Sequence, residues 1–87
     1  MRIGPVQQQH INFLNADKSR YVLHIDAYFD EYTIIIMDEQ GNDFYKLRPA
    51  MFQALKEKGI IAVSNRMVRT ERITIDHYKL TSKYVTP

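Results

Sequence analysis

The fold is decided by the stretch PAMFQALKEKGIIAV, residues 49–63. Pro49 suits the first position of a helix, because its missing N–H would be unpaired there in any case. Apolar side chains follow at helical spacing, and Gly59 is the residue type that commonly ends a helix in the left-handed conformation. The segment 60–63 is apolar and mostly β-branched. The stretch therefore predicts a helix over residues 49–58 that leads directly into a strand.

The segments outside this stretch predict a second helix and further strands. Pro5 begins an apolar stripe that predicts a helix over residues 5–15. Alternating or β-branched runs predict strands over residues 20–29, 32–37, 44–47 and 73–80. Gly41 and Asn42 lie between two of these runs and can supply positive φ, so they predict a hairpin turn. The polar and basic segment 64–72 predicts the loop of a second hairpin.

These elements predict an α+β fold, in which two main helices pack on a small antiparallel sheet of four or five strands. With 87 residues, the chain is expected to form a single domain, residues 1–87, of which residues 81–87 are a frayed tail. The absence of cysteine excludes disulfides, thiolate zinc sites and thiol nucleophiles. The longest apolar run, residues 34–37, is far shorter than the roughly 20 residues of a membrane helix. Since the N-terminal segment also lacks the apolar core of a signal peptide, we expect a cytoplasmic protein with no membrane partner.

The charge of the chain is split between its two halves. Residues 1–45 carry three Lys or Arg and seven Asp or Glu, whereas residues 46–87 carry nine Lys or Arg and three Asp or Glu. The formal net charge of +2 is therefore the balance of an acidic half and a basic half. Such an asymmetry indicates a polyanionic partner for one face or head-to-tail self-association. Alternatively, the fold intermixes both halves on its surface.

The stretch FQALKEKGII, residues 52–61, and the later stretch YKLT, residues 78–81, together resemble the last helix and the wing of winged helix-turn-helix proteins. The resemblance implies that residues 6–14 correspond to the first helix of that family. It also implies a recognition surface flanked by Arg48, Gln53 and Lys56 and a wing that carries Arg66, Arg69 and Arg72. The family has a second helix before the recognition helix, whereas residues 32–47 predict a hairpin.

The basic residues favour a small, non-enzymatic DNA-binding or regulatory protein. Lysines and arginines at such density neutralise phosphates and release counterions without reading a base sequence. We expect double-stranded DNA as the partner, contacted by the helix 49–58 and the basic hairpin 64–73. The three wing arginines are expected to contact phosphates, and Arg48, Gln53 and Lys56 are expected to lie near the bases. The alternative without a partner is solvated charge on a structural hairpin.

A protein-interaction or self-assembling module, using the aromatic strands and the acidic half, is the alternative function. The chain has six Tyr and four Phe, more than a small core can bury, and Tyr is enriched at protein interfaces. The segment 32–37 is apolar on both of its predicted faces, which indicates a strand covered on both sides. One possibility is a homodimer paired edge to edge, with Tyr32, Ile34 and Ile36 in its interface. The other is a central strand with one of the two helices on each face.

Catalytic and metal sites are not expected. His10, His24 and His77 lie far apart in the chain, and none belongs to a motif with metal-ligand spacing. His24 and Asp26 share one face of a predicted strand, and a carboxylate beside a histidine can orient a general base. However, no nucleophile is marked, and the three glycines of the chain form no phosphate-binding loop. We therefore expect no enzyme activity, no cofactor and no metal.

Overall fold

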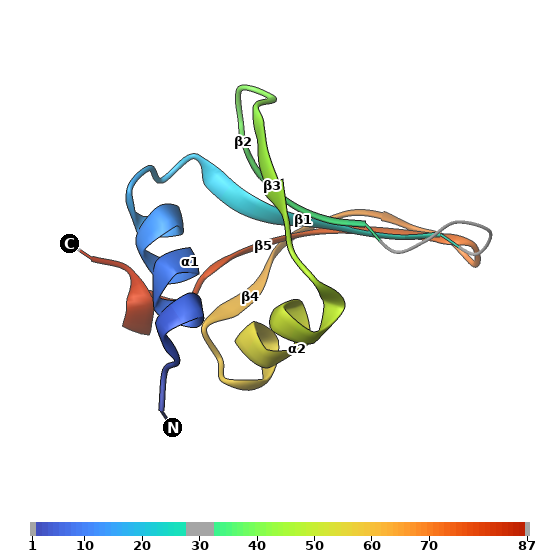
Figure 1. Cartoon of the computed structure of the whole chain (residues 1–87). Helices are drawn as coiled ribbons and strands as arrows, with labels where there is room; N and C mark the ends of the chain where they lie inside the picture. The colour runs from blue at the N-terminus through green and yellow to red at the C-terminus, as the bar shows by residue number, and fades with distance from the viewer. Residues whose placement is uncertain (1, 28–32, 87) are drawn as a thin grey trace.

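The structure, a computed structural model, describes residues 2–27 and 33–86. Within this part of the chain it contains two α-helices, five strands and one short 3₁₀ helix (Figure 1). In chain order they are α1 (Pro5–Asn15), β1 (Arg20–Ala27), β2 (Thr33–Asp38), β3 (Asp43–Lys46), α2 (Pro49–Glu57), β4 (Ile61–Arg69), β5 (Ile73–Leu80) and η1 (Ser82–Tyr84). The predicted α+β class is confirmed. Residues 28 and 29 of the predicted strand 20–29 lie outside the described residues.

The five strands form one antiparallel sheet in the order β3-β2-β1-β5-β4. β1 lies in the middle and pairs with β2 on one side and with β5 on the other. The first half of the sequence therefore supplies β3, β2 and β1 from one edge of the sheet, and the second half supplies β5 and β4 at the other edge. Glu39 and Asp43 lie at the β2–β3 hairpin, whereas Arg66 and Arg69 lie on β4 at the opposite edge.

Both helices pack on the same face of the sheet (Figure 1). One buried cluster joins the helices to the strands beneath them, and its members include Ile11, Leu14, Val22, Ile36, Phe52, Leu55 and Tyr78. We call this side of the sheet the helix face and the opposite side the open face. The arrangement with one helix on each face is wrong, because a single core receives the apolar stripes of both helices.

Two glycines adopt the conformations that their turns need. Gly59 has φ +70° after α2, and the backbone N–H of Ile60 donates to the carbonyl of Leu55 at 2.9 Å, which closes the end of the helix. Gly41 has φ +88° in the β2–β3 turn, as its position predicts. Asn42 does not have positive φ; its backbone N–H donates instead to the carboxylate of Asp38 at 2.9 Å.

Most of the predicted basic loop, residues 64–72, is strand. β4 continues to Arg69 because its backbone pairs with β5. Only residues 70–72 form the turn, in which the hydroxyl of Thr70 accepts hydrogen bonds from the backbone N–H groups of Arg72 (3.2 Å) and Ile73 (3.0 Å). The prediction that residues 64–72 form the loop of the hairpin is therefore wrong for residues 64–69.

The C-terminal residues 81–86 fold back against α1 and do not fray. The side chain of Asn15 donates to the carbonyl of Tyr84 at 2.7 Å and accepts from the backbone N–H of Thr86 at 2.9 Å. The hydroxyl of Thr81 donates to the carbonyl of Gly59 at 2.7 Å. These bonds join positions far apart in the sequence, so the predicted frayed tail is wrong over residues 81–86, and residue 87 lies outside the described residues.

Candidate nucleic-acid interface

The β4–β5 hairpin extends beyond the two helices, and we call its residues 64–76 the arm (Figure 1). Every residue from Ser64 to Ile73 is exposed. The arm carries three of the six residues predicted to contact nucleic acid: Arg66 and Arg69 on β4 and Arg72 in the turn. It is therefore the first surface to consider as a binding site.

Two bulges in β4 determine which way its arginines point. The register pairs Val63 with Tyr78, Arg66 with Asp76 and Arg69 with Thr74, and it shifts between Val63 and Asn65 and again between Arg66 and Val68. Residues 74, 76 and 78 alternate with their neighbours along β5 and share one face, so their partners on β4 share that face too. Residues three apart on a regular strand would face opposite sides. The bulges thus place both arginines on the helix face of the arm.

Arg69 forms an ion pair with Asp76 on this face. The guanidinium and the carboxylate are 3.1 Å apart; the Arg69 side chain is 52% exposed and that of Asp76 only 3%. The second carboxylate oxygen of Asp76 is buried and has no hydrogen-bond partner within residues 2–27 and 33–86. Asp76 therefore depends on Arg69 for compensation of its buried charge, and it neutralises part of the positive charge of the arm.

His24 lies directly across from Asp76, where the arm meets the core. Its ring packs against Phe52 of α2, with the ring centroids 4.8 Å apart. Burial lowers the pKa of His24; the charge of Lys56 lowers it further, while Asp26 and Asp76 oppose the shift. The imidazole is therefore neutral at pH 7 and adds no positive charge to the arm.

Lys56 brings a cation from α2 to the same place. Its ammonium lies 5.0 Å from the ring centroid of Phe52 and 5.7 Å from that of Tyr78, distances at which a cation is attracted to an aromatic ring. Lys56, Arg66 and Arg69 therefore lie on one side of the sheet, although they come from two elements; Lys56 and Arg66 are near the base of the arm, and Arg69 is near its tip.

The two remaining predicted contact residues lie on α2 away from this group. Arg48 precedes the first turn of the helix and is exposed. Gln53 is also exposed, and its amide donates to the carboxylate of Glu57 at 3.1 Å. In the part of the chain that the structure describes, no hydrogen bond joins either residue to Lys56, Arg66 or Arg69.

The structure places the predicted interface residues differently. Ile34 and Ile36 are 2% and 0% exposed and point into the core on the helix face. Their side chains are covered by the chain itself, which corrects their assignment to a homodimer interface. Tyr32 lies outside the described residues. The residues of β2 that face the open side are Thr33, Ile35 and Met37.

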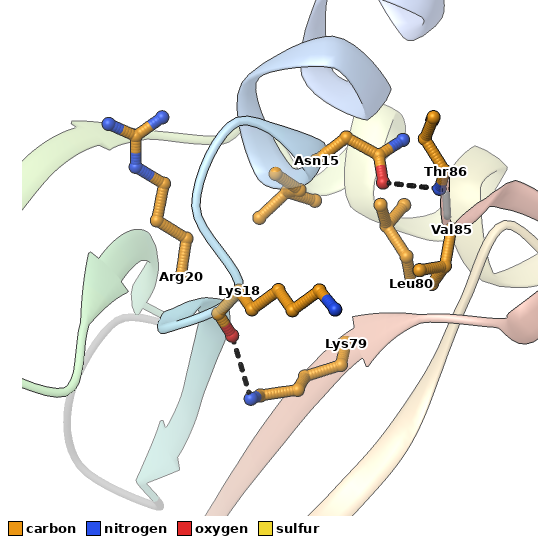
Figure 2. Close-up of a pocket in the computed structure, with 8 residues that line it drawn as sticks. Asn15, Lys18, Arg20, Lys79, Leu80, Val85 and Thr86 are labelled. Atoms are coloured by element: carbon orange, nitrogen blue, oxygen red, sulfur yellow. Dashed lines mark hydrogen bonds between the residues drawn. The ribbon is translucent and has the colours of Figure 1, made fainter.

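A small cavity that the sequence did not indicate lies between the end of α1, the start of β1, the end of β5 and the C-terminal residues (Figure 2). Its volume is about 250 Å³, and three cations, Lys18, Arg20 and Lys79, are among its lining residues. Two of them are engaged in contacts within the chain. Arg20 donates to the carbonyl of Phe13 at 2.8 Å, and Lys79 donates to the carbonyl of Lys18 at 3.1 Å. The residues that line the cavity come from both ends of the sequence, so no local sequence pattern indicates the cavity.

Comparisons with models of protein families, with characterised proteins and with solved structures give no match. Among the described residues, no group of three or more potential ligands is placed to hold a metal ion. No helix in the described part of the chain is long and apolar enough to cross a membrane. The fold and the candidate site together define a small α+β domain with an open antiparallel sheet and a basic arm.

Proposed function

We propose that this protein binds nucleic acid through the helix face of the arm, beside the end of α2. Lys56, Arg66 and Arg69 lie on this side, and Arg72 lies in the turn at the tip. The partners of Arg66 and Arg69 on β5 are two residues apart, so the two arginines are separated by about 7 Å along the strand. That distance is about twice the 3.4 Å of helix axis per phosphate of a DNA strand. The spacing therefore fits two phosphates of one backbone.

The pair of bulges in β4 is the observation that carries the proposal, because it aligns arginines that a regular strand would send to opposite sides. Bulges and charged side chains on an edge strand also prevent pairing with other chains, and that role needs no nucleic acid. Asp76 and Asp26 reduce the positive potential on the same face. The experiment must therefore separate binding by the arm from general attraction to a basic protein.

The resemblance to winged helix-turn-helix proteins supports the same surface. α2, β4 and β5 follow one another as the last helix and the wing do in that family. β2 and β3 stand where the family has its second helix, so the resemblance gives no reason to expect the usual docking of a recognition helix. We therefore assign phosphate contacts to the arm and retain Arg48, Gln53 and Lys56 as the candidates near the bases.

Fluorescence anisotropy with a labelled DNA duplex tests the proposal between about 50 and 200 mM salt. We expect affinity to fall steeply with salt, because each phosphate contact releases counterions. Arg66→Ala and Arg72→Ala should each lower the slope of log K against log salt by about one unit. Arg69→Ala should lower it less, since part of its charge is already neutralised by Asp76.

Lys83→Ala is the matched control, because it removes one exposed charge from η1, outside the arm. It should leave the slope nearly unchanged. The absence of binding at the lowest salt concentration contradicts the proposal. An equal decrease in slope for Lys83→Ala and Arg66→Ala also contradicts it, because the binding would then reflect total charge alone.

A further inference from the structure

The centre of the open face is apolar, although a sheet face that contacts water normally carries polar residues. The strand register gathers seven apolar residues at the centre of this face, with Thr33, Asn65 and His77 beside them: Leu23, Ile25, Ala27, Ile35, Val68, Ile73 and Ile75. An antiparallel sheet that turns one face to water normally carries polar residues there. This face therefore has the composition of a buried surface.

No helix of the described chain covers the centre of this face, since both pack on the other side (Figure 1). Leu23, Ile25 and Ile75 are only half-buried, and Val68 and Ile73 are 39% and 41% exposed. The described cations on this face, Lys46 on β3 and Lys79 near the end of β5, lie away from its apolar centre. Contiguous apolar patches of this kind mark interaction sites.

The open face is large enough for a specific interface. Four neighbouring strands contribute to it, which makes it about 19 Å wide at about 4.8 Å per strand. The six residue steps from Tyr21 to Ala27 give it a length of about 20 Å at about 3.3 Å per residue. Two such surfaces in contact bury roughly 1,000 Å² in total once the relief of the side chains is included, which is the size at which specific interfaces begin.

The edges of the sheet are poorly suited to pairing with another chain. β4 has two bulges and carries Arg66 and Arg69, and both features prevent strand addition. β3, at the other edge, has only four residues and is soon followed by Pro49. A homodimer paired edge to edge is therefore disfavoured, and the uncovered face is the surface left to bury.

We infer that two copies of this chain stack through their open faces into a two-fold symmetric dimer. A surface that is apolar at its centre and carries charges of both signs, Lys46, Lys79 and Asp43, away from that centre is complementary to itself, as a two-fold interface requires. Sheets stacked about 10 Å apart bury their inner faces as the core of a β-sandwich does. The helix faces and the cations of the arm remain outside, so the dimer does not depend on nucleic-acid binding and does not prevent it.

Sedimentation equilibrium of the full chain over a wide range of concentrations tests the dimer. We expect a mass of twice the 10.3 kDa of one chain at high concentration and the mass of a single chain on dilution. Ile25→Lys should give a folded monomer at every concentration, because the half-buried position can hold its ammonium in water only when no second sheet covers it. Thr74→Lys is the matched control, since Thr74 is also half-buried but lies on the helix face of the neighbouring strand β5, and it should leave the dimer intact.

Val68→Lys provides a second test if Ile25→Lys does not fold, because Val68 is already 39% exposed in the single chain. Circular dichroism establishes that each variant is folded before its mass is compared. A native chain that remains a monomer at high concentration overturns the inference, as does a folded Ile25→Lys or Val68→Lys variant that remains a dimer. Dissociation of the Thr74→Lys variant also overturns it, since the contact would then lie on the other face.

Discussion

Both faces of the sheet carry apolar residues on β1 and β2, and the two faces differ in what covers those residues. On the helix face, Val22 of β1 is 0% exposed. Leu23 and Ile25 of the same strand point to the open face. Both remain half-buried, because no helix covers that face. An apolar pattern in the sequence thus shows which side chains favour burial. Which of them are buried within one chain depends on where the helices pack.

The largest expected effect contrasts two adjacent isoleucines of β2. Ile36 is fully buried on the helix face, so Ile36→Ala should lower the free energy of unfolding by about 3 kcal/mol through lost contacts and the cavity left behind. Ile35 faces the open side and is half-buried, so Ile35→Ala should cost only about 1 kcal/mol in the dilute single chain. Urea denaturation at low protein concentration measures both values.

Concentration sharpens this contrast. If the open faces stack, the Ile35→Ala loss should grow when the protein is concentrated, because the dimer buries that side chain. The Ile36→Ala loss should change little, since its surroundings lie within one chain. Equal losses for the two variants in dilute solution would contradict the difference between the faces.

Local patterns were sufficient to predict most elements of the fold. The proline at the start and the glycine after the end located α2 within one residue, and alternation located β1 and β5. The pattern could not assign the helices to a face, because an apolar stripe is satisfied by any apolar surface. The sequence also did not predict that the C-terminal residues are held against α1. They are held by hydrogen bonds to Asn15, a residue far away in the chain.

The candidate site was predictable in its residue types and not in its geometry. The charge pattern singled out Arg66 and Arg69, and their spacing of three residues indicated no common face. Their alignment depends on the bulge near Met67, and the bulge near Ser64 decides which face they share; neither residue is a glycine that would mark a bulge. Nor does the sequence distinguish the buried Asp76 from an exposed acid, because burial follows from the pairing of β5 with both of its neighbours.

A smaller effect concerns the polar part of the helix face. Arg69→Ala leaves the carboxylate of Asp76 buried without its partner and should lower the free energy of unfolding by about 2 kcal/mol. This is less than for a fully buried pair, because Arg69 is half exposed to water. Arg66→Ala, two positions along the same face, should change stability by less than about 0.5 kcal/mol.

A double-mutant cycle isolates the ion pair. Asp76→Asn removes the buried charge, so Arg69→Ala should cost much less in the Asp76→Asn background than in the native chain. Urea denaturation of the four proteins at neutral pH gives the coupling energy. If the losses of unfolding free energy from the two substitutions are additive, Asp76 does not depend on Arg69 for its stability. The two residues would then have no measurable interaction energy.

The smallest expected effect is a pH dependence that separates a histidine of the helix face from one of the open face. Burial lowers the pKa of His24 below its ordinary value of 6.5, so below about pH 6.5 the unfolded chain binds a proton that the folded chain does not. The stability associated with neutral His24 is complete above that pH and is lost as the pH falls toward the folded pKa. Stability should therefore fall as the pH is lowered from 7 to 5. In the His24→Gln variant, the thermal unfolding temperature should therefore change less between pH 7 and pH 5 than in the native chain. The His77→Gln variant should show a smaller difference from the native chain. Burial lowers the pKa of His77 in the same direction, but this residue on the open face is only half-buried. An unchanged profile for His24→Gln would show that the ring at the base of the arm is as accessible to water as the open face.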